Sequence, residues 1–265
     1  MQGTFKWAPS FIPWSAGDCY RILPNVRRSK PKGPIAALAV SLLACTAFSC
    51  GGSSNNDQSE QPTRTEQVSE ERGSVPQTVL DIEGDAEDAI DQVFAGRWDR
   101  VSSDAISLAA NWEDFLASSN ASRLNDEQRR AMDKAISDLR ATAQSQDALA
   151  ARQAANDVSK VIVDVFDLFE HKVPSDIGRL DWQERQVLID ADRGDWNAVA
   201  GDLAQLRQTF NRAKPGVLAA GGERQTADFE ASLNEQDRLA AAKDPGIVDE
   251  ANVALELVDD LEGVY

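Results

Sequence analysis

Apolar residues recur at every third or fourth position through most of the chain after Pro76, which is the period of an amphipathic α-helix. One such stripe contains Trp98, Val101, Ala105, Leu108, Trp112 and Phe115, and another contains Trp196, Val199, Leu203, Leu206 and Phe210. Segments that alternate apolar and polar residues, as half-buried strands do, are absent from the sequence. The pattern predicts an all-α fold of about eight helices.

The helical region contains an internal repeat, because similar residues return at one constant offset. The matched pairs are Val75-Pro76 with Val173-Pro174, Gly96 with Gly194, Trp98 with Trp196, Val101 with Val199, Asp104 with Asp202, Leu108 with Leu206, and Trp112 with Phe210. Further along, the offset slips slightly and pairs Ala155-Asn156 with Ala251-Asn252. We predict a tandem duplication of a four-helix unit, with repeats over 76–172 and 173–265. Both two similar antiparallel units and one merged antiparallel bundle fit the pattern.

Glycines mark the end of the first helix in each repeat. Gly96 and Gly194 can adopt the left-handed conformation that follows a helix end, and a tryptophan two residues later begins the next helix. The positions expected to anchor the fold are Trp98, Trp112, Trp196, Phe210, Gly96 and Gly194. Because both repeats carry these residues on apolar stripes, we interpret the tryptophans as core residues rather than as a ligand-stacking site.

Other helix starts are marked by capping residues. Asn125 can cap the third helix while Gln128 reaches back, and Asp244-Pro245-Gly246 fits a helix start with aspartate as the cap and proline in the first turn. The fourth helix of the first repeat is the most apolar. Its wide apolar face contains Ala154, Val158, Val161, Ile162, Val165, Phe166 and Phe169.

The segment from Arg27 to Asp57 has the order of an export signal. Basic residues come first, an uncharged apolar stretch from Ile35 to Leu43 follows, and then come cysteines and a Gly/Ser/Asn tract. A membrane-spanning helix needs roughly 20 apolar residues, so this stretch is too short to span comfortably. We interpret residues 1–49 as the signal region. Residues 1–25 have no role in such a signal, which suggests an upstream extension before a start at Val26.

Two cysteines are candidates for lipidation at the end of this signal. Leu42-Leu43-Ala44-Cys45 has the usual leucine-first order, whereas Ala47-Phe48-Ser49-Cys50 lies directly before a flexible tract. We favour Cys50 and keep Cys45 as the alternative, because cleavage at Cys45 would leave Cys50 as an unpaired thiol in an oxidising compartment. Residues 50–75 lack large apolar side chains almost entirely, which predicts a flexible tether.

This signal region resembles that of bacterial lipoproteins. The resemblance implies a fatty-acylated (palmitate-type) anchor that holds the chain in the cell envelope, on the periplasmic or outer face of a membrane. In a host with two membranes, Gly51 stands where lipoproteins retained on the inner membrane commonly carry aspartate, which implies the outer membrane. The resemblance covers about the first fifth of the chain and leaves the activity of the helical region open.

The net charge of the chain limits the classes of molecule that it can bind. The chain has 27 basic and 44 acidic residues. Removal of residues 1–49 takes away six basic residues and one acidic residue, which leaves 21 against 43 and a net charge near −22. Such a surface repels nucleic acid, so we expect no nucleic-acid partner. It favours cations or basic partners.

Candidate chemistry in the helical region is sparse. It has no cysteine, and His171 is the single histidine in the chain. Asp164, Asp167 and His171 follow one another at intervals of three and four residues and therefore share a helix face, which makes them weak candidates for metal ligands. Nothing predicts a resident cofactor, and there is little material for nucleophilic catalysis.

The duplicated helical arrangement is similar to that of periplasmic imelysin-like proteins, which are connected with iron uptake. Their Gly-x-His-x-x-Glu motif has no match, since Lys172 to Pro174 follow the only histidine, and no ligand is carried over. We therefore expect a lipid-anchored, non-enzymatic helical-bundle module that binds an envelope protein or a small ligand. The alternative is a periplasmic accessory protein that handles iron or copper, and a hydrolase comes third.

Overall fold

Eight α-helices make up most of residues 73–265, the part of the chain that the computed structural model describes. They are α1 (Gln77–Phe94), α2 (Trp98–Ala117), α3 (Asp126–Ser145), α4 (Ala148–Phe166), α5 (Ser175–Arg193), α6 (Trp196–Ala219), α7 (Glu223–Ala242) and α8 (Ile247–Glu262), with a 3-10 helix at Ser119–Arg123. The prediction of an all-α fold with about eight helices is confirmed. The signal region, Cys45, Cys50 and the tether up to residue 72 lie outside the described residues.

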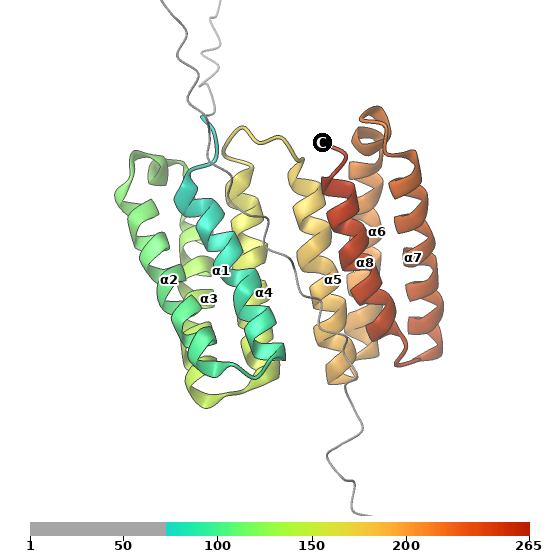
Figure 1. The fold of residues 1–265 in the computed structure, drawn as a ribbon, viewed down its shortest axis with the longest axis horizontal. Helices are drawn as coiled ribbons and strands as arrows, with labels where there is room; N and C mark the ends of the chain where they lie inside the picture. Colours follow the sequence, from blue (N-terminus) through green and yellow to red (C-terminus); the bar gives the residue numbers. More distant parts are fainter. Residues whose placement is uncertain (1–72) are drawn as a thin grey trace, which may run out of the picture. The chain divides into compact units, whose positions relative to one another are not determined.

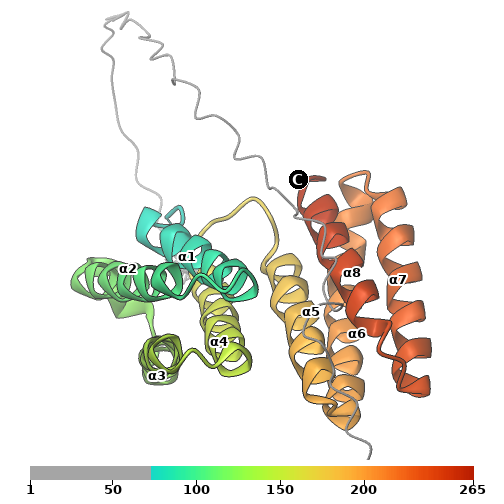
Figure 2. The same cartoon turned by 60° about the horizontal axis from the view of Figure 1, so that its bottom comes forward.

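The helices form two sets of four, α1–α4 and α5–α8 (Figures 1 and 2). In the first set α1 and α3 each pack against both α2 and α4, and in the second set α5 and α7 each pack against both α6 and α8. Each set has its own buried apolar cluster, and α4 packs against α5 where the two sets meet. Of the two arrangements that fit the sequence, the structure has two four-helix units. Their common origin by duplication stays a prediction.

The predicted aromatic anchors divide into core and edge positions. Trp112 and Phe210 are buried in the first and second clusters, where Trp112 stacks on Phe115 and Phe210 packs on Phe229. The indole nitrogen of Trp112 donates a 2.8 Å hydrogen bond to Asp133, which satisfies its one polar atom. Trp98 and Trp196 are the first residues of α2 and α6 and are only partly buried against the clusters.

The predicted helix ends are confirmed at three positions. Gly96 has φ of 66° and Gly194 has φ of 70°, the left-handed conformation that an L-residue adopts only at a cost. The Asn125 side chain accepts a hydrogen bond from the backbone of Gln128, and the Gln128 side chain accepts one from the backbone of Asn125. Both orphan amides at the start of α3 are thereby satisfied.

Two predicted helix boundaries are wrong. α8 begins at Ile247, so Pro245 lies before the helix rather than in its first turn, and the Asp244 side chain accepts a 2.9 Å hydrogen bond from the backbone amide of Gly246. α4 ends at Phe166, so Phe169 and His171 lie in the connection to α5 rather than on the helix.

The described end of the predicted tether is held in place, because Gly73 accepts a 2.9 Å hydrogen bond from the backbone of Glu170.

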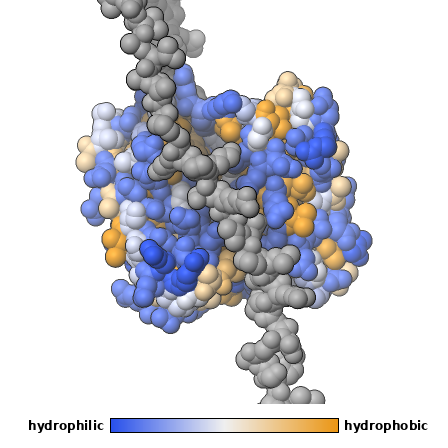
Figure 3. Space-filling view, viewed as in Figure 1, coloured by the Kyte–Doolittle hydropathy of each residue, from blue (hydrophilic) through white to orange (hydrophobic). Residues whose placement is uncertain are grey.

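The surface shown in Figure 3 is mostly hydrophilic, with apolar residues scattered among charged ones. The large apolar side chains that are exposed on the described residues are Leu80, Phe94, Ile106, Leu218 and Val253. The apolar stripe of each helix packs into the core of its own four-helix unit, as expected for amphipathic helices of a bundle. None of the helices in residues 73–265 combines the length and the apolar character needed to cross a membrane.

Candidate functional site

The three residues predicted as weak metal candidates are already engaged with other side chains. The carboxylates of Asp164 and Asp167 both form ion pairs with Arg179 of α5. Burial alone would raise the pKa of Asp167, but hydrogen bonds from Ser175 and Arg179 lower it. Within residues 73–265 the structure contains no group of three or more His, Cys, Asp or Glu side chains arranged to hold a metal ion.

His171 lies beside a serine, which raises the question of nucleophilic catalysis. Its Nε2 atom is 2.6 Å from Oγ of Ser175, the first residue of α5, and Asp167 is hydrogen-bonded to the same Ser175 hydroxyl. A catalytic relay requires the acid on the histidine, where it orients the ring, rather than on the serine. The arrangement instead ties the α4–α5 connection to the start of α5.

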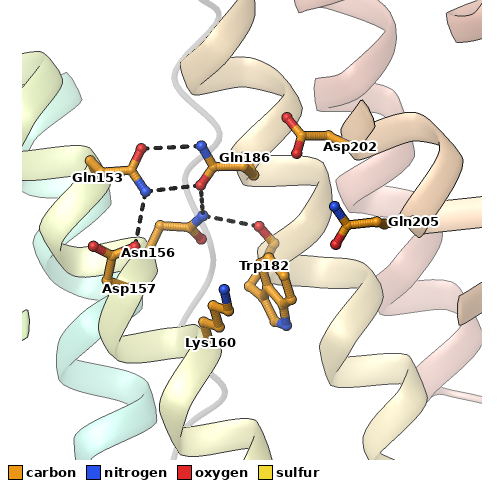
Figure 4. A pocket seen from close by; sticks show the side chains of 8 residues that line it. All are labelled: Gln153, Asn156, Asp157, Lys160, Trp182, Gln186, Asp202 and Gln205. Atoms are coloured by element: carbon orange, nitrogen blue, oxygen red, sulfur yellow. Dashed lines mark hydrogen bonds between the residues drawn. The ribbon is translucent and has the colours of Figure 1, made fainter. Parts of the chain in front are cut away.

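A polar cleft of about 250 Å³ lies where α4, α5 and α6 meet (Figure 4). We call it the α4–α5–α6 cleft, and its lining residues are Gln153, Asn156, Asp157, Lys160, Trp182, Gln186, Asp202 and Gln205. The four residues from α4 are spaced by three, one and three positions, so they form one stripe on the face opposite that helix's apolar core. Packing of α4 against α5 turns this stripe into the wall of a cleft.

Amide side chains cross the cleft and fix its walls relative to each other. Gln153 of α4 and Gln186 of α5 exchange hydrogen bonds of 2.9 and 3.1 Å through their side-chain amides. Asn156 donates to the backbone oxygen of Trp182 at 3.0 Å and to the Gln186 side chain at 3.1 Å. In each of these bonds one partner lies on α4 and the other on α5. The network therefore joins the two four-helix units through directional bonds.

Carboxyl groups are linked to the ends of this amide network. Gln153 donates to Asp157 at 2.9 Å, and Gln186 donates to Asp190 at 2.9 Å. Burial raises the pKa of Asp157. Burial, followed by the hydrogen bond and the negative charge of Asp190, raises the pKa of Asp202 to about 7. Asp202 is therefore partly protonated near neutral pH.

A single cationic side chain lines the cleft. The ammonium nitrogen of Lys160 lies 5.2 Å from the ring centroid of Trp182, in a cation–π contact. Its charge lowers the pKa values of both Asp157 and Asp202, against the effect of their burial, so it lies within electrostatic reach of both. Lys160 is exposed on α4, so its long side chain can leave this position without disturbing a core.

Two oxygen atoms of the lining residues have no hydrogen-bond partner. They are Oδ1 of Asn156, whose residue is 1% exposed, and Oδ2 of Asp202. The orientation of the Asn156 amide is fixed, since the backbone oxygen of Trp182 can only accept and therefore requires the NH2 group. The free oxygen points toward the Lys160 side of the cleft (Figure 4). Both unsatisfied atoms are oxygens, and the Asn156 oxygen can only accept a hydrogen bond.

A second polar cluster holds the two units together on a different face of α5. Arg185 of α5 forms ion pairs with Glu87 of α1 at 2.9 Å and with Asp181 at 2.6 Å. Glu83 lies beside this cluster, and burial, with the charges of Glu87, Glu262 and Asp181, raises its pKa to about 8. The cavity among these side chains measures about 20 Å³, room for roughly one water molecule, so it is a joint rather than a ligand site.

The sequence reasoning missed most of this cleft. Gln186 and Lys160 were not singled out, because polar residues on one face of a helix normally indicate exposure to solvent, and Trp182 was not recognised either. The available signal was the polar stripe Gln153, Asn156, Asp157 and Lys160 within the most apolar helix. Such a stripe indicates a site only when a second polar helix face is known to lie opposite.

No protein-family model matches this chain, and neither a curated protein nor a solved structure matches it.

Proposed function

We propose that this chain is a lipid-anchored, non-enzymatic helical-bundle module of the cell envelope that binds a small polar ligand in the α4–α5–α6 cleft. The observation that carries the proposal is the unsatisfied Asn156 oxygen beside Trp182, within walls fixed by the Gln153–Gln186 pair. Ligand sites typically combine an aromatic surface with a few fixed polar groups. The volume of about 250 Å³ suits a molecule smaller than a typical drug.

The order of residues from Arg27 to Cys50 supports the lipid anchor, as the resemblance to lipoprotein signals implies. Support for a binding rather than catalytic role comes from the contacts of the ionisable groups. His171 is engaged with Ser175, away from the cleft, and the cleft's own ionisable side chains are two aspartates and one lysine. These groups can recognise charge and hydrogen-bond donors, and none of them forms an activated nucleophile beside a base.

The proposal is tested by native mass spectrometry of the full chain extracted gently from its own host membrane. We expect a chain that starts at Cys50, carries diacylglyceryl and acyl groups, and retains a non-covalent small molecule. Gln205→Tyr, which fills the exposed mouth of the cleft, should abolish the retained mass. Gln208→Tyr makes the same change at another exposed position of α6 and should preserve it.

Each half of the proposal has its own contrary result. A mature chain without lipid would refute the anchor. A lipidated chain without retained mass, or with equal retention in the Gln205→Tyr and Gln208→Tyr proteins, would refute the cleft as the binding site.

A further inference from the structure

We infer that the ligand of the α4–α5–α6 cleft is a small organic cation with a primary ammonium group, and that Lys160 marks the position this group takes. The inference rests on the proposed function and names the ligand class for the same cleft. It follows from three features of the lining: the aromatic ring that already receives an ammonium, the acceptors without donors, and the carboxyl groups on two sides.

The Trp182 ring is the first feature. Its face receives the ammonium of Lys160 at 5.2 Å from the ring centroid, which shows that a cation of this size fits there. A tryptophan face attracts cations more strongly than the other aromatic rings do. A ligand ammonium can replace Lys160 at this position, because the exposed lysine loses little on moving into solvent.

The unsatisfied acceptors are the second feature. Asn156 and Asp202 each have one buried oxygen atom that lacks a hydrogen-bond donor, and the Asn156 oxygen cannot be exchanged for the NH2 group without losing the bond to Trp182. An ammonium group carries three donors and no acceptor, which matches this need. A carboxylate or phosphate ligand would bring further acceptors and leave these atoms unsatisfied.

Charge is the third feature. Asp157 and Asp202 lie on different sides of the cleft (Figure 4), and Asp190 is hydrogen-bonded to Asp202. An anion would be repelled by these carboxyl groups, whereas a cation is attracted by them and by the acidic surface as a whole. The opposed positions of Asp157 and Asp202 favour a ligand with two amino groups over one with a single charge.

The test is calorimetric titration of the lipidated full chain in detergent at pH 8 with 1,4-diaminobutane. The matched neutral probe is 1,4-butanediol, which has the same carbon chain and hydroxyl groups in place of the amines. We expect one diamine bound per chain and no heat from the diol. Asp202→Asn should weaken diamine binding about tenfold, since it removes a charge-assisted contact, whereas Asp114→Asn, at an exposed position of α2, should not change it.

The Lys160→Gln variant gives a result whose sign depends on the ligand class. For a cationic ligand, loss of the competing ammonium should tighten diamine binding about fivefold, as expected for one cation–π contact. For an anionic or sugar-like ligand the same change removes a donor and weakens binding. Lys172→Gln, an exposed lysine outside the cleft lining, is the matched control and should leave the affinity unchanged.

Affinity should also rise with pH. Asp202 faces Lys160 from α4, Asp190 from α5 and Asp195 at the start of α6; burial and the two aspartates raise its pKa to about 7, while the charge of Lys160 lowers it. Ionisation of Asp202 between pH 6 and pH 8 therefore adds an attraction for the diamine. We expect about tenfold tighter binding at pH 8 than at pH 6, and no such change in Asp202→Asn.

Failure of this inference is distinguishable from failure of the proposed function. Equal binding of diamine and diol, no diamine binding, or weaker binding in Lys160→Gln would overturn the cationic ligand class. If the protein from its host membrane still retains a molecule that Gln205→Tyr displaces, the cleft remains a binding site for a different ligand. A retained molecule that contains a primary amine supports both.

Discussion

A buried glutamate should make the protein less stable as the pH rises, and Glu184→Gln should remove this effect. Glu184 lies on the buried face of α5 and is 0% exposed. One oxygen accepts a 3.0 Å hydrogen bond from Gln236 of α7, and the other has no hydrogen-bond partner. Within residues 73–265 no ion pair compensates a charge at this position, so the neutral acid is the form that fits the core.

The direction and the size of this change in the free energy of unfolding follow from the pKa of Glu184. Burial is the main cause that raises the pKa of Glu184 from 4.5 to about 8. Below pH 4.5 the acid is protonated in both the folded and the unfolded chain, and its ionisation costs nothing. Between pH 4.5 and 8 only the unfolded chain releases the proton, so the free energy of unfolding falls with rising pH. A tenfold change in proton affinity corresponds to about 1.4 kcal/mol, which gives an upper limit of roughly 5 kcal/mol above pH 8.

Glutamine keeps the shape of the neutral acid and cannot ionise. We expect Glu184→Gln to be within about 1 kcal/mol of the wild-type protein at pH 5 and to be about 3 kcal/mol more stable at pH 8.5, where water entry reduces the full penalty. The measurement is urea unfolding of the full chain at both pH values, followed by circular dichroism at 222 nm. Glu113→Gln, at an exposed position of α2, is the control for loss of one negative charge.

The reasoning would be refuted by a Glu184→Gln protein whose advantage is the same at pH 5 and pH 8.5. It would also be refuted if the variant were less stable than the wild type at pH 8.5, since that result would require a charged Glu184 with a favourable partner. An equal gain in Glu113→Gln would assign the effect to net charge rather than to burial.

Three further predictions concern two helix ends and the contact between the two four-helix units. Urea unfolding measures the change in stability in each case. Gly194→Ala should cost about 1 kcal/mol because its φ of 70° disfavours a Cβ atom, whereas Gly201→Ala inside α6 should stabilise by about 0.5 kcal/mol; equal effects would contradict this. Asn125→Ala removes the α3 capping box and should cost about 1 kcal/mol. Arg185→Met leaves Glu87 without this partner and should cost about 3 kcal/mol, part of which Glu87→Gln in the same chain should recover.

The helices were predictable because their stripes are set by local sequence. Residues such as Leu108 and Leu206 return with the helical period, and both lie at 0% exposure in the core. Even Glu184, a charged residue, lies on the buried face of α5 with Leu180 and Val187. Boundaries were less predictable, since Asp244 caps a turn with the same chemistry that it would use to cap a helix.

The candidate cleft was not predictable in the same way, because it depends on contacts between distant helices. Gln153 and Gln186 form a reciprocal amide pair only after α4 and α5 pack together. In the sequence each of them is a polar residue on a helix face, which indicates solvent. The apolar stripes fit both two four-helix units and one merged bundle. The cleft forms only where two such units meet.

The joint also explains why the matched position in the second repeat does not form the wall of this cleft. Asn156 matches Asn252 in the sequence, yet Asn156 is buried and donates across to Trp182, whereas Asn252 is exposed and donates to Val248 of its own helix. α4 packs against α5, while α8, its counterpart, packs against α5 and α7 within its own unit. The same residue type therefore serves a local bond in one repeat and the cleft wall in the other.

The acids show the same difference between the repeats. Asp104 matches Asp202, and each has an unsatisfied Oδ2 atom and a raised pKa, of about 6 and about 7, with burial as the main cause. Asp202 shares its cleft with Lys160 and Trp182, whereas Asp104 lies with Asp85 and Asp88 of its own unit. In the proposed binding mode, a buried acid becomes a ligand contact only where a second unit supplies the opposite wall. The variants that separate binding from stability should therefore lie on α4 and α6 at this joint, and the same changes at the matched positions should leave ligand binding intact.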